Sequence, residues 1–309
     1  MRKPIALALQ VTVSVALLAL LLRQVPLADV GGALARLRPG TIALALALVL
    51  VSYLGRAQRW AGLLARSGRT LALAPAWGLT LLGVGYGLVT PGKVGEFARV
   101  VHLGVPSHQA FASVLWDRVT DVLLLELLAL PAFLLVPAWR GPVMWLFLAV
   151  VAATVVGVAV LESRRLQALG ARLVPPLAGT LGRWQEASAG TLTSGAFRVG
   201  LAGGVFYYAL NFAAAFLMVR DLAPDASPAL VLGFPIIPLL GNLPIAFSGL
   251  GLREQVSALL FTAAGTDPAV GPAYSLAYFG LGTLVPGVLG LLLGATPWLR
   301  DAARAREAA

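Results

Sequence analysis

The sequence predicts an all-α polytopic membrane protein. Of its 309 residues, 59% are hydrophobic and only 12% are charged, whereas soluble domains carry about 25% charged residues. The mean hydropathy is +0.88, and the apolar residues stand in long blocks rather than at the periods of half-buried helices or strands. We expect about six full transmembrane helices and two opposed re-entrant hairpins of broken helices. Eight or more spans are the alternative, because each hairpin can also be read as two full spans.

The net charge and the residues that the chain lacks exclude several classes of function. The formal net charge is +10, which in so apolar a chain indicates loop topology rather than a nucleic-acid surface. The chain has no cysteine and only two histidines, His102 and His108. Disulfides, thiolate nucleophiles and cysteine- or histidine-rich metal sites are therefore not expected. We predict no metal, no cofactor and no nucleic-acid partner.

The first two spans begin at the N-terminus. A basic pair, Arg2-Lys3, precedes an apolar run over residues 5–22, which is long for a signal peptide and indicates an uncleaved first span. Residues 23–40 are expected to form a loop. The second span begins near residue 41 and ends in residues that are typical of a membrane interface, with snorkelling arginines and a belt tryptophan, Arg56, Arg59 and Trp60.

Residues 76–108 predict the first hairpin. The run over residues 76–90 is shorter than the roughly 20 residues that a span needs, and four glycines allow close packing there, Gly78, Gly83, Gly85 and Gly87. Pro91 and Gly92 break the helix, which resumes over residues 94–108 with polar positions at three-residue spacing, Glu96, Arg99 and His102. Such a backbone persists at membrane depth only when it is buried in protein or lines a watery cavity.

The next span, over residues 111–136, carries four charges, Asp117, Arg118, Asp121 and Glu126. Each charge near the bilayer centre costs about 2.5–3.5 kcal/mol on insertion scales, so these groups must face partners or water. Asp117 and Asp121 share a helix face, and Arg118 is placed to pair with Asp121 three residues on. Glu126 is expected to reach the outer interface.

The second half of the chain repeats this plan in a diverged form. Spans are expected over residues 143–161, 201–219 and 274–297, and the arginine-rich segment 162–200 is expected to form amphipathic helices on the membrane. The run 230–247 is apolar but interrupted by Pro235, Pro238, Gly241, Asn242 and Pro244. It leads into Gly249, Gly251, Arg253 and Glu254 and then into a helix over 255–264. Two such broken segments suggest an inverted repeat with halves 1–141 and 142–309, in one membrane domain over residues 1–309 without a soluble catalytic domain.

The basic residues predict the topology. With both termini in the cytoplasm, residues 1–4, 56–75, 162–200 and the C-terminal tail hold 14 Lys and Arg, and the outer loops hold 5. This bias follows the positive-inside rule. It makes the first hairpin enter from the cytoplasm and the second from outside.

Four motifs carry a family resemblance: Arg56-x-x-Arg59-Trp60, Pro91-Gly92-Lys93-x-Gly95-Glu96-x-x-Arg99, Asp117-Arg118-x-x-Asp121 and Gly249-x-Gly251-x-Arg253-Glu254. In this order they resemble the transmembrane domain of lysylphosphatidylglycerol synthases, which is also found alone in flippase-like membrane proteins. The resemblance covers nearly the whole chain. It implies a role in moving or handling a phospholipid or polyprenyl-linked lipid at the bacterial inner membrane. Full synthases add a soluble aminoacyl-transfer domain, which has no counterpart before Ala309, so synthase activity is not expected.

The charged residues therefore have two interpretations. In the first, they form a polar cradle for an anionic phospholipid or polyprenyl-phosphate headgroup, in which Lys93 and Arg99 contact the phosphate and Glu96 orients an arginine or relays a proton. The cradle would consist of Lys93, Glu96, Arg99, Asp117, Arg118, Asp121, Arg253 and Glu254, with Arg56, Arg59 and Asn242 as secondary candidates. In the second, they are structural ion pairs. A flippase is the preferred function; a membrane-embedded glycosyl- or phosphotransferase acting on a lipid carrier, or an accessory subunit, is the alternative.

Overall fold

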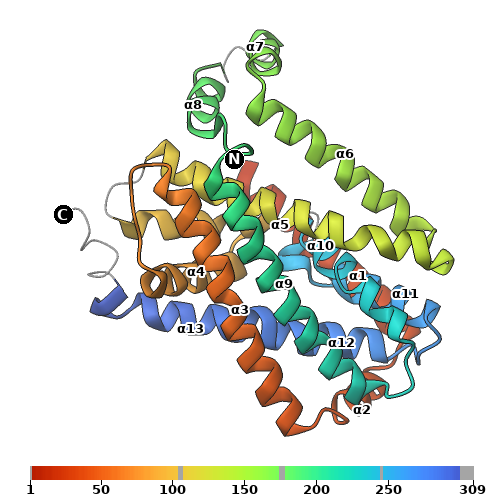
Figure 1. The fold of residues 1–309 in the computed structure, drawn as a ribbon. Coiled ribbons are helices and arrows are strands. Elements are labelled where there is room, and N and C mark those ends of the chain that lie inside the picture. Colours follow the sequence, from red (N-terminus) through yellow and green to blue (C-terminus); the bar gives the residue numbers. More distant parts are fainter. Residues whose placement is uncertain (1, 104–106, 174–177, 244–245, 300–309) are drawn as a thin grey trace.

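The computed structural model describes residues 2–103, 107–173, 178–243 and 246–299, and the regular elements in these ranges are all helical (Figure 1). The long helices are α1 (Arg2–Gln24), α3 (Pro39–Ala65), α5 (His108–Leu135), α6 (Pro142–Glu162) and α9 (Gly195–Leu222). A further one is continuous from α12 (Val270–Phe279) through a π-helical turn, η6 (Gly280–Leu284), into α13 (Val285–Gly294).

Within the described chain, four helices are long and apolar enough to cross a membrane: α3, α6, α9 and the helix Val270–Gly294. A fifth is reached if α1 and the short helix α2 (Leu27–Leu34), which are bent by 85°, count as one span. Helix α5 has the length of a span but carries the four charges. The class of polytopic helical membrane protein is confirmed.

The predicted loop over residues 23–40 is wrong, because α2 occupies its middle. Pro26 explains the break between α1 and α2. It has no backbone N–H to donate and disfavours helical geometry at the preceding residue, so the chain turns and starts a new helix with Asp29 in its first turn.

Helices α3 and α9 form the antiparallel centre of the fold. A Cβ added at Gly55 would collide with the carbonyl of Gly203, so the two backbones touch there. At one end of this pair, the Arg38 Nε donates to Asp221 Oδ1 at 2.8 Å. At the other end, Arg66 donates to the carbonyl of Ala189 at 3.0 Å. These two links lie at opposite ends of the α3–α9 pair.

The first hairpin consists of α4 (Leu73–Leu88) and the 3₁₀ helix η1 (Pro91–Leu103). The three-residue spacing seen in the sequence fits this tighter helix, in which residues three apart lie above one another. Gly83 and Gly87 face the side chains of η1, and Gly85 packs on Gly287 of α13. The four glycines are packing positions, as expected.

The second hairpin runs from η4 (Pro228–Gly233) and α10 (Ile236–Gly241) through η5 (Phe247–Gly249) into α11 (Leu252–Ala263). The break predicted at Pro244 lies outside the described residues. This hairpin leaves from the Asp221 end of α9, whereas the first leaves from the Ala65 end of α3. They therefore enter from opposite ends of the bundle. Their tips meet where Lys93 Nζ donates to Asn242 Oδ1 at 2.5 Å.

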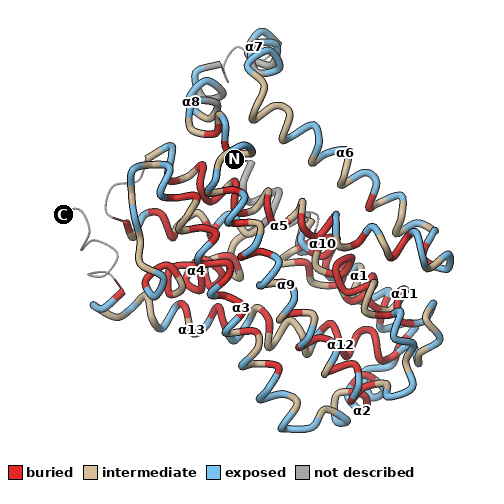
Figure 2. The backbone as a smooth tube through the Cα atoms, viewed as in Figure 1, coloured by how far each residue is buried: buried red, intermediate tan, exposed pale blue. Residues whose placement is uncertain are grey.

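Helix α6 lies at the edge of the bundle, with α7 (Arg164–Leu173) and α8 (Ala178–Ser188) beyond its end (Figure 1). Burial concentrates on the helices around the two hairpins, while α6 is mostly open (Figure 2). The arginine-rich segment thus forms helices, as expected; their place on a membrane surface stays a prediction.

Candidate functional site

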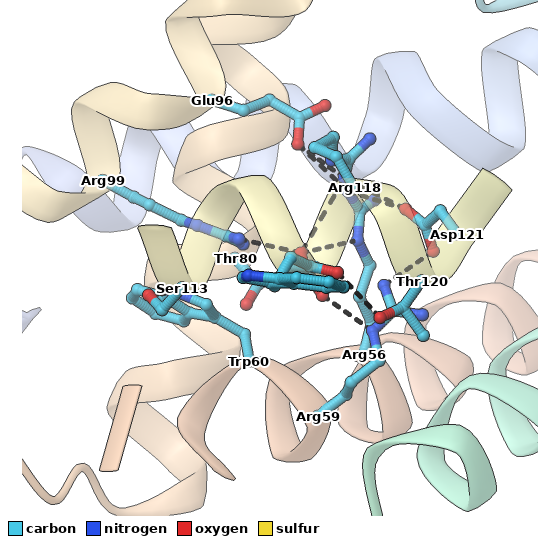
Figure 3. Close-up of polar contacts among 12 residues, drawn as sticks. Arg56, Arg59, Trp60, Thr80, Glu96, Arg99, Ser113, Arg118, Thr120 and Asp121 are labelled. Carbon is cyan, nitrogen blue, oxygen red and sulfur yellow. Dashed lines mark hydrogen bonds and ion pairs between the residues drawn. The ribbon is translucent and has the colours of Figure 1, made fainter. Parts of the chain in front are cut away.

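A buried ion-pair cluster joins α3, η1 and α5 (Figure 3). Arg59 donates from Nε to Asp117 Oδ1 at 2.7 Å and from Nη2 to Asp121 Oδ1 at 2.6 Å. Arg99 donates from Nη2 to the other oxygen of Asp117 at 2.8 Å. One guanidinium can bridge both aspartates because they lie four residues apart on one face of α5, as predicted.

A second layer of the cluster is built on Glu96. Its Oε2 lies 3.0 Å from Arg56 Nη2 and 2.6 Å from Arg118 Nη2. Arg118 also lies 3.3 Å from Asp121 Oδ2, the i,i+3 pair predicted from the sequence. Arg56 reaches the same Asp121 oxygen at 3.5 Å. The seven side chains thus form one continuous network.

The interfacial interpretation of Arg56, Arg59 and Trp60 is wrong. Their exposed fractions are 4%, 1% and 0%, so none of them reaches an interface. The Arg99 guanidinium lies 4.2 Å from the centre of the Trp60 ring, a cation–π contact. Because α3 continues to Ala65, these residues lie inside the helix rather than at its end.

Glu126 does not reach the outer interface either. It is 8% exposed and accepts a hydrogen bond from the Thr154 hydroxyl at 2.7 Å. Thr154 stands on α6, and no pattern in the sequence indicated that α6 packs against this part of α5.

The cluster has a surplus of positive charge. Four arginines, Arg56, Arg59, Arg99 and Arg118, face three carboxylates, Glu96, Asp117 and Asp121. Each arginine keeps at least one buried guanidinium nitrogen without a hydrogen-bond partner. An unsatisfied buried donor is costly, more so when it is charged. Among the described residues, the cluster thus combines a formal surplus of one positive charge with buried guanidinium nitrogens that have no hydrogen-bond partner.

The outer layer of the cluster lines a cavity of about 80 Å³ between the hairpins. Arg56, Glu96, Arg118 and Asp121 form one wall, and Lys93 and Asn242 project from the two tips. Arg59, Arg99 and Asp117 lie behind this wall and do not line the cavity. The structure thus brings most of the predicted residues to one place and divides them into a lining set and a supporting set.

Sequence reasoning missed part of the lining, a polar group made of Tyr53, Tyr207, Tyr208, Asn211, Ser248 and Tyr278. Asn211 connects three helices: it donates to Ser52 Oγ at 2.6 Å and accepts from the Tyr278 hydroxyl at 2.8 Å. The signal was available, because Tyr207, Tyr208 and Asn211 are polar groups in the middle of an apolar span. The local sequence, however, does not predict which residues of other helices they contact.

Arg253 and Glu254 lie apart from the cluster and have different surroundings. Glu254 is fully buried and accepts from the backbone N–H of Gly251 at 2.7 Å and from Ser275 Oγ at 2.9 Å. It therefore anchors the start of α11. Arg253 stacks 3.9 Å from the centre of the Phe279 ring and lines a second cavity of about 50 Å³. Lys93 and Asn242 line both cavities.

The glycines after the two breaks have comparable positions. A Cβ at Gly95 would collide with the Tyr86 carbonyl at the end of α4, and one at Gly249 with the Gly241 carbonyl at the end of α10. Gly249 and Gly251 also have positive φ, 75° and 83°, which glycine adopts without strain. Pro91 and Gly92 begin η1, so the break falls where it was predicted.

The family model described as "Lysylphosphatidylglycerol synthase TM region" matches residues 7–290. The chain belongs to this family. None of the curated proteins matches the chain significantly. Membership identifies a multi-pass membrane protein with a lipid-related function, and the match includes both hairpins and every residue of the cluster.

Proposed function

We propose that this protein is a lipid flippase that moves an anionic phospholipid or polyprenyl-phosphate-linked lipid through the cavity between its two hairpins. The observation that carries the proposal is the net positive, incompletely satisfied cluster on the wall of that cavity. A lipid headgroup cannot cross hydrocarbon without large desolvation costs. A polar cavity at membrane depth removes much of that cost while the chains stay in lipid.

Arg118 is the residue best placed to meet a phosphate. Its side chain is 23% exposed, the most open in the cluster, and its Nε is buried without a hydrogen-bond partner. Lys93 stands across the cavity on a hairpin tip. Guanidinium and ammonium groups of this kind bind phosphate oxygens through charge-assisted hydrogen bonds.

The opposed hairpins supply the alternating access that transport requires. Broken helices of inverted orientation that meet near the membrane midplane are a recurrent transporter plan. Lys93 and Asn242 line both cavities, so the opening of their contact would join the two cavities in the proposed transport cycle. We place the protein in the bacterial inner membrane with both termini in the cytoplasm.

Reconstituted proteoliposomes test this proposal. A headgroup-labelled anionic phospholipid should exchange between leaflets faster than in empty vesicles, and Arg118→Gln should slow the exchange about tenfold, the loss of one phosphate contact of about 1.4 kcal/mol. Arg56 still pairs with Glu96 in that variant, so the fold is retained. Arg198→Gln, an exposed arginine near the start of α9, is the matched control.

Label that stays in one leaflet at the rate of empty vesicles would refute the flippase proposal. Formation of a chemically altered lipid by the reconstituted protein would instead favour the membrane-embedded transferase.

A further inference from the structure

A separate apolar groove lies between α5 and α6. Its volume is about 500 Å³, and it is open along one side. The α5 wall is formed by Leu115, Arg118, Val119 and Val122, and the α6 wall by Thr154, Gly157, Val158, Val160 and Leu161. Positions i, i+3, i+4 and i+7 recur in both sets, so each helix presents one face to the groove.

The surface of the groove is almost entirely hydrocarbon. The hydroxyl of Thr154 is occupied, because its oxygen lies 2.7 Å from Glu126 Oε1 and 2.9 Å from the carbonyl of Val150, and its single hydrogen is donated to one of these acceptors. From Leu115 to Val122 the groove follows α5 for about 10 Å at 1.5 Å per residue.

Arg118 joins the groove to the headgroup cavity. It lines both, and its guanidinium reaches Glu96 on the cavity side at 2.6 Å. Its aliphatic stem covers apolar surface while its charged end stays with polar partners. A single side chain therefore separates a cationic site from a hydrocarbon groove. A lipid has the same arrangement, with an anionic group directly joined to apolar chains.

We infer that the α5–α6 groove holds a hydrocarbon chain of the lipid whose headgroup occupies the charged cavity. This inference rests on the proposed function and adds a lateral path for the chain. The groove opens at the edge of the bundle, where α6 is little buried, so the chain enters from the bilayer and not through the protein. Arg118 then contacts headgroup and chain at their junction.

Gly157 allows the groove to be filled without disturbing the fold. A Cβ added there meets no atom within 4 Å. Gly157→Trp therefore occupies the groove, and Val158→Phe fills it from the next position. Ala152→Trp adds the same bulk to an exposed position on α6, about 140° around the helix from Gly157 at 100° per residue, and serves as the matched control.

The experiment uses proteoliposomes that contain phosphatidylglycerol with a diazirine in the middle of one acyl chain. After irradiation, we expect crosslinks to concentrate in peptides with the groove residues of α5 and α6. Gly157→Trp and Val158→Phe should lower this crosslinking and the leaflet exchange rate about tenfold, as expected for two lost methylene contacts. Ala152→Trp should leave both unchanged.

Crosslinking spread evenly over the exposed faces of the helices, or insensitive to both groove-filling variants, would overturn the inference. So would a change in oligomeric mass in both variants, which would identify the groove as a contact for a second copy. Groove crosslinking without any leaflet exchange would support the chain site and refute the flippase. Leaflet exchange at the wild-type rate in both groove-filling variants would support the flippase and refute the chain site.

Discussion

Asp117 holds the centre of the site although it touches no cavity. Its two oxygens pair with Arg59 on α3 and Arg99 on η1, and Arg56 lies 3.8 Å away. The residue is 0% exposed. Removing one partner from a buried ion pair leaves the others without compensation, which costs more than the pair itself contributed.

We therefore expect Asp117→Ala to lower the free energy of unfolding by about 3–5 kcal/mol, the range for an orphaned buried charge. Thermal denaturation in detergent measures this loss of stability as a lower Tm. Asp225→Ala, which removes an exposed carboxylate, is the control and should leave Tm unchanged. Equal stability of the two variants would show that the arginines find other partners.

Lys93 is held in an unusual backbone conformation. Its φ is 57°, and among described residues only Ser248, on the other tip, shares a positive φ without being glycine. This conformation costs an L-residue with a Cβ about 1–2 kcal/mol, and such strain is typical of functional positions.

We therefore expect Lys93→Gly to lower lipid exchange without lowering the stability of the fold. It relieves the strain, so we expect Tm to stay constant or rise, while loss of the cation lowers headgroup exchange about tenfold, the effect of about 1.4 kcal/mol. Exchange at the wild-type rate would exclude Lys93 from the phosphate site. Lys93→Asn, which also tolerates positive φ, should behave in the same way.

At the scale of elements, the proposed transport requires the two tips to move. They follow helices that are too short to span, α4 and the segment Pro228–Gly241, and the side chains of Lys93 and Asn242 form a hydrogen bond between them. The chain contains no cysteine, so introduced cysteines are the only thiols.

A double variant, Lys93→Cys with Asn242→Cys, should therefore be locked by a short bifunctional maleimide. Locked tips cannot separate, and we expect leaflet exchange to fall below the level of the unlinked double variant. The same reagent on either single variant is the control. Crosslinking without any further loss of exchange would mean that the tips need not part.

The sequence contains enough to predict these elements but not their partners. Proline interrupts a helix because it has no backbone N–H, and glycine adopts backbone conformations that other residues avoid. These residues therefore mark the breaks, and both hairpins are predicted from them. Arg56 and Arg59 were misplaced because arginines with a tryptophan after an apolar run look the same at an interface and in a polar core. Their partners on η1 and α5 are 40 to 65 residues away, beyond any local pattern.

At the scale of the whole molecule, the excess of Lys and Arg on the cytoplasmic side remains after Arg56 and Arg59 are assigned to the buried cluster. With Arg56 and Arg59 moved into the interior, two fewer basic residues count as cytoplasmic, and the bias changes from 14 against 5 to 12 against 5. The orientation predicted by the positive-inside rule is unaffected.

Single cysteines test that orientation. Ser67 follows the Ala65 end of α3, and Asp267 precedes α12 near the opposite end. Ser67→Cys should react with an impermeant maleimide only from the cytoplasmic side, and Asp267→Cys only from the outside. Labelling of both from one side would invalidate the opposed arrangement of hairpins relative to the membrane.

The surplus charge of the cavity has an electrical consequence. Lys93 and the four arginines outnumber Glu96, Asp117 and Asp121 by two. Any motion that carries these groups through the membrane field does work, about 2.3 kcal/mol for each charge across 100 mV. A monoanionic headgroup halves that surplus while it is bound. If the protein is the flippase proposed above, we therefore expect membrane voltage to act more strongly on the empty cavity than on the loaded one, and to bias the end toward which the empty protein opens.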